Sequence, residues 1–321
     1  MAQNPARTVD AGPAFSVVVP VYGCAACLSE LCARLGAVLD ELTTRYEVVL
    51  VDDRSPDQSW AAIQSVAKTY PFVVGVRLSR NFGQHIAITA GLEAARGDLV
   101  VVMDCDLQDP PELIPSLYAK LQTGYDLVLA RREERTHSPF RVWAAKFYFG
   151  LLSRLAEERI DGAYGTYCML SRKVVDGFLR FRERERHFLF IVRWLGFDVG
   201  TVDYKHAERL SGRSSYSLKR LIRHAVDGIF FQTTVFLRWI VLVGLCCATI
   251  GLGLAAYFLY QFFALNVQPG WTSLAILTLI STGLNLTSVG VIGQYVGKIF
   301  EQTKERPLYV IDMTSPREKQ W

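Results

Sequence analysis

Charge is absent from a long segment near the C-terminal end of the sequence. Between Trp239 and Gly297 there is no Asp, Glu, Lys, Arg or His. The segment is far longer than the roughly 20 apolar residues that cross a bilayer once, and a polar turn at 266–270 divides it. It therefore predicts two transmembrane helices at about 239–263 and 271–296, within a membrane region of 233–297. The alternative, an apolar hairpin inside a soluble core, would have to bury two uncharged runs of this length.

Basic residues are missing from the turn between the two runs but are frequent on their outer sides. The flanking residues are Lys219, Arg220, Arg223, Arg238, Lys298, Lys304 and Arg306. Because positively charged flanks stay in the cytoplasm, we expect a multi-pass protein of the inner (cytoplasmic) membrane whose large domain is cytoplasmic. Residues 1–14 lack the apolar core of a signal peptide and are expected to form an N-terminal tail, with residues 298–321 as a cytoplasmic C-terminal tail.

The sequence also lacks a disulfide pattern and the common nucleotide-binding loops. Its seven cysteines are an odd number, and cytoplasmic thiols stay reduced, so we expect no disulfide framework. Cys24 and Cys27 form a CxxC without a second pair and are interpreted as ordinary thiols. Neither GxGxxG nor a P-loop GKS/T follows the first predicted strand, which excludes a dinucleotide-binding dehydrogenase and a P-loop ATPase. The net charge of +4 gives no case for nucleic-acid binding.

Residues 15–130 alternate between strand and helix patterns. Short β-branched runs predict strands, and apolar residues at helical spacing predict helices. The alternation predicts an α/β domain, residues 15–232, with a mostly parallel sheet covered by helices on both faces. The predicted strands are 15–19, 47–51, 73–78, 99–103 and 126–130, and the predicted helices are 27–42, 58–69, 84–95 and one opened by Pro110 and Pro111.

Polar residues collect where these five predicted strands end. In open α/β sheets, ligands bind beyond the carboxyl ends of the strands, so the five ends are expected to line one crevice. The polar segments are 20–23, 52–55, 80–84, 104–109 and 131–132.

Two of these segments have carboxylates suited to ligand binding. Asp104 and Asp106 lie two residues apart after an apolar strand and can face one cation, and Gln108 adds an oxygen at the same spacing. Mg²⁺ and Mn²⁺ favour such oxygen ligands and readily bridge a diphosphate. Asp52 and Asp53 could accept hydrogen bonds from a base or ribose, and we assign Asp57 to capping the following helix.

Four segments resemble family 2 glycosyltransferases. They are 17–22, 51–57, 78–85 and 103–112, and the string Asp-Leu-Gln-Asp-Pro-Pro-Glu at 106–112 is the most specific part. Together with the two apolar runs they resemble the polyprenyl-phosphate glycosyltransferases. That group includes dolichyl-phosphate mannose synthases and the bacterial undecaprenyl-phosphate glucosyl and aminoarabinose transferases. The resemblance covers residues 15 to about 310.

The resemblance implies a GT-A (Rossmann-like) catalytic domain followed by the transmembrane hairpin. It implies a hexosyl- or pentosyltransferase that transfers a sugar, with inversion, from a nucleotide-sugar to undecaprenyl phosphate; by analogy with bacterial relatives the donor would be a UDP-sugar. The products would be a polyprenyl-phospho-sugar and a nucleoside diphosphate, as in modification of lipopolysaccharide or cell-wall glycan in the cell envelope. Relatives of this kind often form homo-tetramers.

The resemblance also implies roles for individual residues. The Mg²⁺ or Mn²⁺ ligands would be Asp104, Asp106 and Gln108. The residues in contact with the donor would be Pro20, Tyr22, Asp52, Asp53, Arg80, Gln84 and Asp104. Those in contact with the acceptor phosphate would be Arg131, Arg132, Ser138, Arg209, Ser214 and Tyr216. The catalytic residues would be Asp104, Asp106, Arg131 and Arg209.

The predicted acceptor site rests on arginines and on the chemistry of a phosphate. Arg209 lies in 206–217, which resembles the family's HxxRxxGxSKY segment, and an Arg fork suits phosphate oxygens. With a second pKa of ~6, a lipid phosphate is largely ionised at neutral pH and needs no strong general base. The amphipathic segments 140–155 and 217–231 are expected at the membrane interface, although the first could instead pack on the sheet.

Four positions depart from the family pattern. Gly23-Cys24 replaces the usual Asn-Glu, Ser215 replaces a Lys, and Thr166 stands where many relatives have an Asp that has been proposed as a base. Asp161 lies near that position without a clear alignment. The changes affect the acceptor side more than the fold.

Two other functions fit parts of the sequence. A processive polysaccharide synthase would have a Gln-x-x-Arg-Trp motif and more membrane spans, but Phe190 stands at the Gln position before Arg193-Trp194. A non-catalytic membrane scaffold with the same fold is disfavoured by the intact Asp104, Asp106 and Gln108.

Overall fold

The computed structural model describes residues 13–132, 164–184, 186–204, 235–265 and 270–315. The chain forms two compact units. The first comprises Met1–Ala145, Asp161–Ser214 and Pro307–Trp321, and the second comprises Lys146–Ile160 and Ser215–Arg306. The predicted interface segments 140–155 and 217–231 lie outside the described residues.

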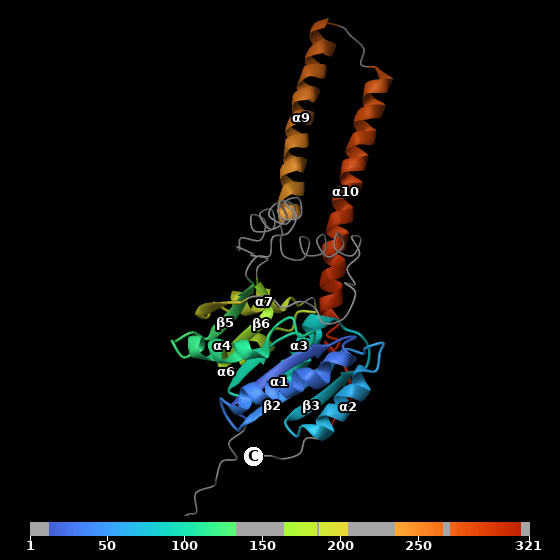
Figure 1. Cartoon of the computed structure of the whole chain (residues 1–321). Helices are drawn as coiled ribbons and strands as arrows, with labels where there is room; N and C mark the ends of the chain where they lie inside the picture. The colour runs from blue at the N-terminus through green and yellow to red at the C-terminus, as the bar shows by residue number, and fades with distance from the viewer. Residues whose placement is uncertain (1–12, 133–163, 185, 205–234, 266–269, 316–321) are drawn as a thin grey trace, which may run out of the picture. The chain divides into compact units, whose positions relative to one another are not determined.

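Among the described residues, the first unit contains one eight-stranded sheet in the order β7-β5-β6-β4-β1-β2-β3-β8 (Figure 1). The strands are β1 Phe15–Val21, β2 Tyr46–Asp52, β3 Val73–Leu78, β4 Leu99–Val102, β5 Leu127–Arg132, β6 Tyr164–Ser171, β7 Val199–Tyr204 and β8 Ile311–Thr314. The helices are α1 Leu28–Asp40, α2 Ser59–Thr69, α3 Gln84–Ala94, α4 Ile114–Leu121, α6 Arg172–Leu179 and α7 Phe188–Trp194, and the 3-10 turns are η1 Ala25–Cys27 and η2 Pro111–Leu113. The predicted elements between residues 15 and 130 are therefore confirmed, with ends shifted by a few residues.

The central strands are buried on both sides. Val17 and Val19 of β1 pack in the core layer that contains α1, α2 and α4, whereas Val18 packs in the layer that contains α3, α6 and α7. Successive side chains of a strand point to opposite faces, so a strand covered on both faces must be apolar throughout. This explains the three consecutive valines, 17–19, at the centre of β1.

The sheet is mixed rather than mostly parallel. β4, β1, β2 and β3 are parallel, and so are β5 and β7. However, β6 is antiparallel to both β4 and β5, and β8 is antiparallel to β3. The prediction therefore holds for the βα-alternating part and is wrong for β6 and β8, because antiparallel pairing needs no crossover helix and leaves no such alternation in the sequence.

Strand directions place the polar segments at one edge of the sheet. β1 to β4 are parallel, and β5 runs in the same direction as β4 because both are antiparallel to β6. The carboxyl ends of β1 to β5 thus lie at the same edge, as predicted. The amino end of β6 lies there too, which adds a segment that the prediction did not include.

The second unit contains two long helices, α9 Val235–Leu265 and α10 Trp271–Thr303. They confirm that the two charge-free runs are helical, since α9 ends at Leu265 and α10 begins at Trp271. Within the described part of the chain, no helix is both long enough and apolar enough to cross a membrane. The transmembrane assignment is not confirmed and stays a prediction, as does the inner-membrane location.

The C-terminal residues differ from the predicted tail. α10 continues to Thr303, beyond the predicted end at 296, and β8 then pairs with β3. An edge strand such as β3 leaves backbone N–H and C=O groups unpaired, and β8 satisfies them. Four residues are too short a run to predict as a strand from sequence alone.

Candidate active site

The loop after β4 presents three oxygen-bearing side chains on one side. Met103, Cys105, Leu107 and Asp109 are buried, whereas Asp104, Asp106 and Gln108 are partly exposed. Leu107 adopts φ 59°, a left-handed conformation that costs a branched residue on the order of 1 kcal/mol. Its buried side chain and a hydrogen bond from the Gln108 N–H to Asp106 Oδ1 (3.2 Å) stabilise this turn. The predicted spacing therefore places Asp104, Asp106 and Gln108 on the accessible side of one loop.

Asp104 is held by side chains from two other elements. Gln84 Nε2, at the start of α3, and Thr166 Oγ1, on β6, both donate to Asp104 Oδ1, at 2.7 and 3.1 Å. The antiparallel register that pairs Val102 with Cys168 brings Thr166 to Asp104. Burial, together with the nearby Asp109 and Asp106 carboxylates, raises the pKa of Asp104 to about 6, although the hydrogen bond from Thr166 lowers it.

The donor set suits a hard divalent cation that also binds a substrate diphosphate. Among the described residues there is no cluster of three or more His, Cys, Asp or Glu side chains that could hold a metal ion by itself. Mg²⁺ is commonly bound by one or two carboxylates together with substrate phosphates. In this loop the two aspartates and the glutamine amide can provide the protein ligands, and the substrate would provide the phosphates. Burial first, and then the neighbouring carboxylates, raise the pKa of Asp104, and a bound cation would offset both effects. Asp104, Asp106 and Gln108 therefore fit Mg²⁺ or Mn²⁺ bound with a diphosphate.

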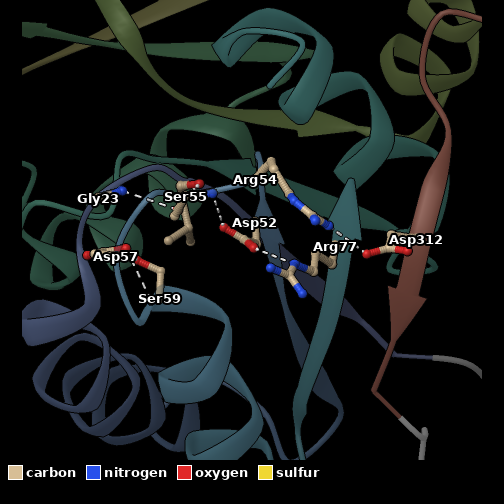
Figure 2. Close-up of polar contacts among 9 residues, drawn as sticks. Gly23, Asp52, Arg54, Ser55, Asp57, Ser59, Arg77 and Asp312 are labelled. Atoms are coloured by element: carbon tan, nitrogen blue, oxygen red, sulfur yellow. Dashed lines mark hydrogen bonds and ion pairs between the residues drawn. The ribbon is translucent and has the colours of Figure 1, made fainter. Parts of the chain in front are cut away.

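Asp52 and Asp53 both bind neighbouring segments at the predicted nucleoside end, and Figure 2 shows the contacts of Asp52. Asp52 is fully buried; its Oδ1 accepts from the Ser55 N–H (2.9 Å) and its Oδ2 lies 3.3 Å from Arg77 Nε. Asp53 accepts hydrogen bonds from the backbone N–H groups of Phe82 (2.7 Å) and Gly83 (2.8 Å). Burial raises the pKa of Asp53, and those two N–H groups oppose the rise. Both carboxylates thus have structural contacts, and their binding of a nucleoside stays a prediction.

The loop after β1 is bonded to the loop after β2. The Gly23 N–H donates to Ser55 Oγ (3.2 Å), and Gly23 has φ 69°, which favours glycine. Asp57 Oδ2 accepts from the Ala25 N–H (3.2 Å), and its Oδ1 accepts from the N–H of Ser59 (3.1 Å), the first residue of α2. Burial alone would raise the pKa of Asp57, but these hydrogen bonds lower it. Asp57 thus binds the first N–H of α2, as predicted, but the N-cap position itself is Gln58, which makes no side-chain capping hydrogen bond.

The CxxC cysteines behave as ordinary thiols. The structure describes all seven cysteines, and none of them forms a disulfide bond. Cys24 Sγ donates to the carbonyl oxygen of Cys105 (3.2 Å), and this contact and burial raise the pKa of Cys24. The Cys24 N–H also donates to Ser59 Oγ (3.2 Å), so Gly23 and Cys24 tie the loops through their backbone.

The other predicted donor residues differ in exposure. Tyr22 is 55% exposed at the end of β1, whereas Pro20 is buried within the strand. The Arg80 guanidinium lies 4.4 Å from the Phe82 ring centroid and is exposed. An exposed aromatic ring and a guanidinium at the same sheet edge are suited to contact a base or a phosphate.

Arg131 and Arg132, the predicted phosphate ligands, already have partners on β7. Arg131 binds Asp203 with two hydrogen bonds, of 2.5 and 2.8 Å, and the ion pair raises the pKa of the exposed Arg131. Arg132 Nε donates to the Tyr204 hydroxyl (3.1 Å), and its Nη2 lies 3.5 Å from Asp109. The structure therefore connects Arg132, but not Arg131, to the loop after β4.

Sequence reasoning missed the buried group around Asp109. The Tyr204 hydroxyl donates to the fully buried Asp109, which also lies near Arg132. Asp109 belongs to the motif at 106–112, which is a signal that could have singled it out. The hydrogen bond from Tyr204 to Asp109 could not be predicted from the sequence, because it depends on the pairing of β5 with β7. Four predicted acceptor residues and one alternative lie outside the described residues: Ser138, Arg209, Ser214, Tyr216 and Asp161.

Curated relatives match this chain over nearly all of its length. An uncharacterized glycosyltransferase, YkcC, from Bacillus subtilis is 35% identical over 92% of this chain and 93% of its own length. The undecaprenyl-phosphate 4-deoxy-4-formamido-L-arabinose transferase of Pseudomonas aeruginosa is 37% identical over 92% of this chain and 89% of its own.

Solved structures show a related fold. The crystal structure of a mycobacterial protein has a TM-score of 0.51 and 22% identity, covering 69% of this chain and 75% of its own. A glucosyl-3-phosphoglycerate synthase of Mycobacterium tuberculosis, crystallised with Mn²⁺ and uridine diphosphate, has a TM-score of 0.49 and 20% identity, covering 72% of this chain and 84% of its own. The mycobacterial structure therefore shares the mixed α/β fold of this chain.

The sequence profile of glycosyl transferase family 2 matches residues 16–179, which include the loops after β1 to β4 and Thr166. With relatives above 30% identity along nearly all of its length, the chain belongs to glycosyl transferase family 2 and is a glycosyltransferase.

Proposed function

We propose that this enzyme transfers a sugar from a UDP-sugar to undecaprenyl phosphate, with inversion and with Mg²⁺ or Mn²⁺, at the cytoplasmic face of the inner membrane. The observation that carries the proposal is the 37% identity with a transferase named for undecaprenyl phosphate, over 92% of this chain and 89% of that protein. The charge-free run between Trp239 and Gly297 supports a lipid acceptor and a membrane location.

The donor is bound at the carboxyl ends of β1 to β4 in this proposal. Asp104, Asp106 and Gln108 would hold the divalent cation, which would supply positive charge next to the diphosphate of the donor. Gln84 and Thr166 orient Asp104 through its Oδ1 atom. Tyr22 and the loop after β2 bind the nucleoside, and the exposed Arg80 lies at the same edge.

A phosphate oxygen of the lipid attacks the anomeric carbon directly. One bond forms between that oxygen and the anomeric carbon, and the bond from that carbon to the diphosphate oxygen breaks, which inverts the configuration. Because the lipid phosphate is already ionised, no residue has to remove a proton, and Thr166 can stand where relatives have an Asp. The protein mainly positions two anionic reactants and screens their charge, and Arg132 and Arg209 are the residues assigned to that screening.

The test uses the purified full chain in detergent with Mn²⁺ or Mg²⁺, undecaprenyl phosphate and a panel of nucleotide-sugars. Mass spectrometry of the lipid fraction should show one new species, heavier by a single sugar, and NMR of that product should show an inverted anomeric centre. Asp106→Asn should yield no product. Asp126→Asn is the matched control, because it neutralises a carboxylate next to the start of β5, at the opposite sheet edge.

A lipid product carrying several sugars would instead favour a processive synthase. Absence of both product and free nucleotide with every donor and either metal would favour the non-catalytic scaffold.

A further inference from the structure

The residues after α10 return to the sheet and are held there by backbone hydrogen bonds. The Ser79 N–H donates to the Val310 carbonyl (2.9 Å), and the Ser315 N–H donates to the Gly75 carbonyl (2.8 Å). The Gly75 N–H in turn donates to Ser315 Oγ (2.6 Å), and Ser315 is buried. β8 is therefore fixed at both ends, although its own four side chains are exposed.

A bulge in this strand redirects Asp312. Arg77 pairs with Met313 and Leu78 pairs with Ile311, so Asp312 is the extra residue between them. Bulges turn a side chain out of the regular alternation and are frequent next to active sites. Here the Asp312 carboxylate lies 2.8 Å from Arg54 Nη1, in the loop after β2 (Figure 2).

Arg54 lies at the centre of a loop that connects several strand ends. It has φ 54°, a left-handed conformation that is unusual for a residue with a side chain. Asp53, the residue directly before it, connects this loop to the end of β1 and to the segment after β3. The Asp53 N–H donates to the Val21 carbonyl (3.0 Å), and the Asp53 carboxylate accepts from the N–H groups of Phe82 and Gly83. A change in the conformation of Arg54 would therefore shift the loops that are predicted to surround the nucleoside.

The ion pair is not needed to attach β8. The strand already has its backbone bonds to β3, and both charged side chains remain partly exposed, at 45% for Arg54 and 33% for Asp312. Exposed ion pairs contribute little to global stability, so this one is better suited to selecting a loop conformation.

We propose that Asp312 is a positioning residue for the donor nucleotide, acting through Arg54 to hold residues 52–57 in the conformation that binds the nucleoside. The inference rests on the proposed function, in which this loop contacts the donor. It gives the C-terminal segment a part in the active site.

The test measures binding of uridine diphosphate with Mn²⁺ to the full chain in detergent by isothermal titration calorimetry. The variants are Asp312→Asn, the charge-exchanged Arg54→Asp/Asp312→Arg, and the matched control Asp126→Asn, which removes the carboxylate of the Lys173–Asp126 pair. Thermal midpoints of all variants separate a folding defect from a binding defect. With the donor identified by the transfer assay, steady-state kinetics give KM and kcat.

Asp312→Asn should weaken uridine diphosphate binding and raise the donor KM by about two- to fivefold, the range expected of an exposed ion pair, with kcat and the thermal midpoint unchanged. The charge-exchanged variant should recover most of the affinity, and Asp126→Asn should match the wild type. If the wild type binds uridine diphosphate and Asp312→Asn binds it equally well, the inference is overturned and the proposed function still stands. The same holds if Asp312→Asn loses affinity and the charge-exchanged variant does not restore it. Failure of the wild type to bind uridine diphosphate would overturn the proposed donor site and the inference with it.

Discussion

Replacing Thr166 by Val tests whether this position orients a metal ligand. Val has nearly the same shape but lacks the hydroxyl that donates to Asp104 Oδ1 at 3.1 Å. The Asp104 carboxylate would keep the hydrogen bond from Gln84 (2.7 Å) and would lose the contact that lowers its pKa. We expect weaker metal binding with an intact fold.

The magnitude follows from the type of hydrogen bond that is lost. Hydrogen bonds to charged groups contribute about 1.5–3 kcal/mol, and the length of this one and the remaining Gln84 bond place it at the lower end. About 1.4 kcal/mol corresponds to a tenfold change in affinity. Because this hydrogen bond is made before the metal binds, only the part of its energy that keeps Asp104 in the metal-binding orientation changes the affinity, so the Mn²⁺ dissociation constant in the presence of uridine diphosphate should rise by up to about tenfold.

Electron paramagnetic resonance of free Mn²⁺ measures this affinity directly, and the metal concentration for half-maximal transfer gives a second estimate. Thr166→Ser is the matched control, because it keeps the hydroxyl, and it should bind Mn²⁺ like the wild type. The reasoning is refuted if Thr166→Val binds Mn²⁺ as tightly as the wild type while Asp106→Asn has lost binding.

The remaining predictions concern the same loop, the acceptor and the core. Asp106→Asn should abolish metal-dependent transfer without changing the thermal midpoint, and near-normal transfer would contradict the metal assignment. Because protons compete with the metal for Asp104, whose pKa is raised to about 6, the apparent Mn²⁺ affinity should be constant above that pH and fall by up to about tenfold per unit below it, as a titration series would show. Arg209→Ala should slow transfer at unchanged expression, and an unaffected rate would remove Arg209 from the site. Gly91→Ala should destabilise the protein by about 1–3 kcal/mol in urea unfolding, because a Cβ there would lie 2.3 Å from Val18 Cγ1; equal stability would show that α3 can move away from β1.

The local elements of the first unit were predictable because their signals are local. The valine run of β1, the periodic apolar residues of α1 and the acidic loop after β4 each occupy a short continuous stretch. The common edge of the strand ends followed from the alternation of strands and helices, since parallel strands must end on the same side. Residue types and spacing alone also predict that Asp104, Asp106 and Gln108 lie together.

The partners of those residues could not be predicted, because they come from segments far away in the chain. Thr166 reaches Asp104 only because β6 is antiparallel to β4, and Tyr204 reaches Asp109 only because β7 lies beside β5. Neither pairing leaves a periodic trace in the sequence.

The sequence by itself determined the family, the βα order of the first half and the candidate metal ligands, because each depends on residue identity over a few neighbouring positions. The tertiary structure decided which carboxylates are already engaged, where Arg131 and Arg132 point, and that Asp312 meets Arg54 from 258 positions away. Those contacts depend on strand register and on a single bulge, and register is set by packing across the whole sheet rather than by any one segment.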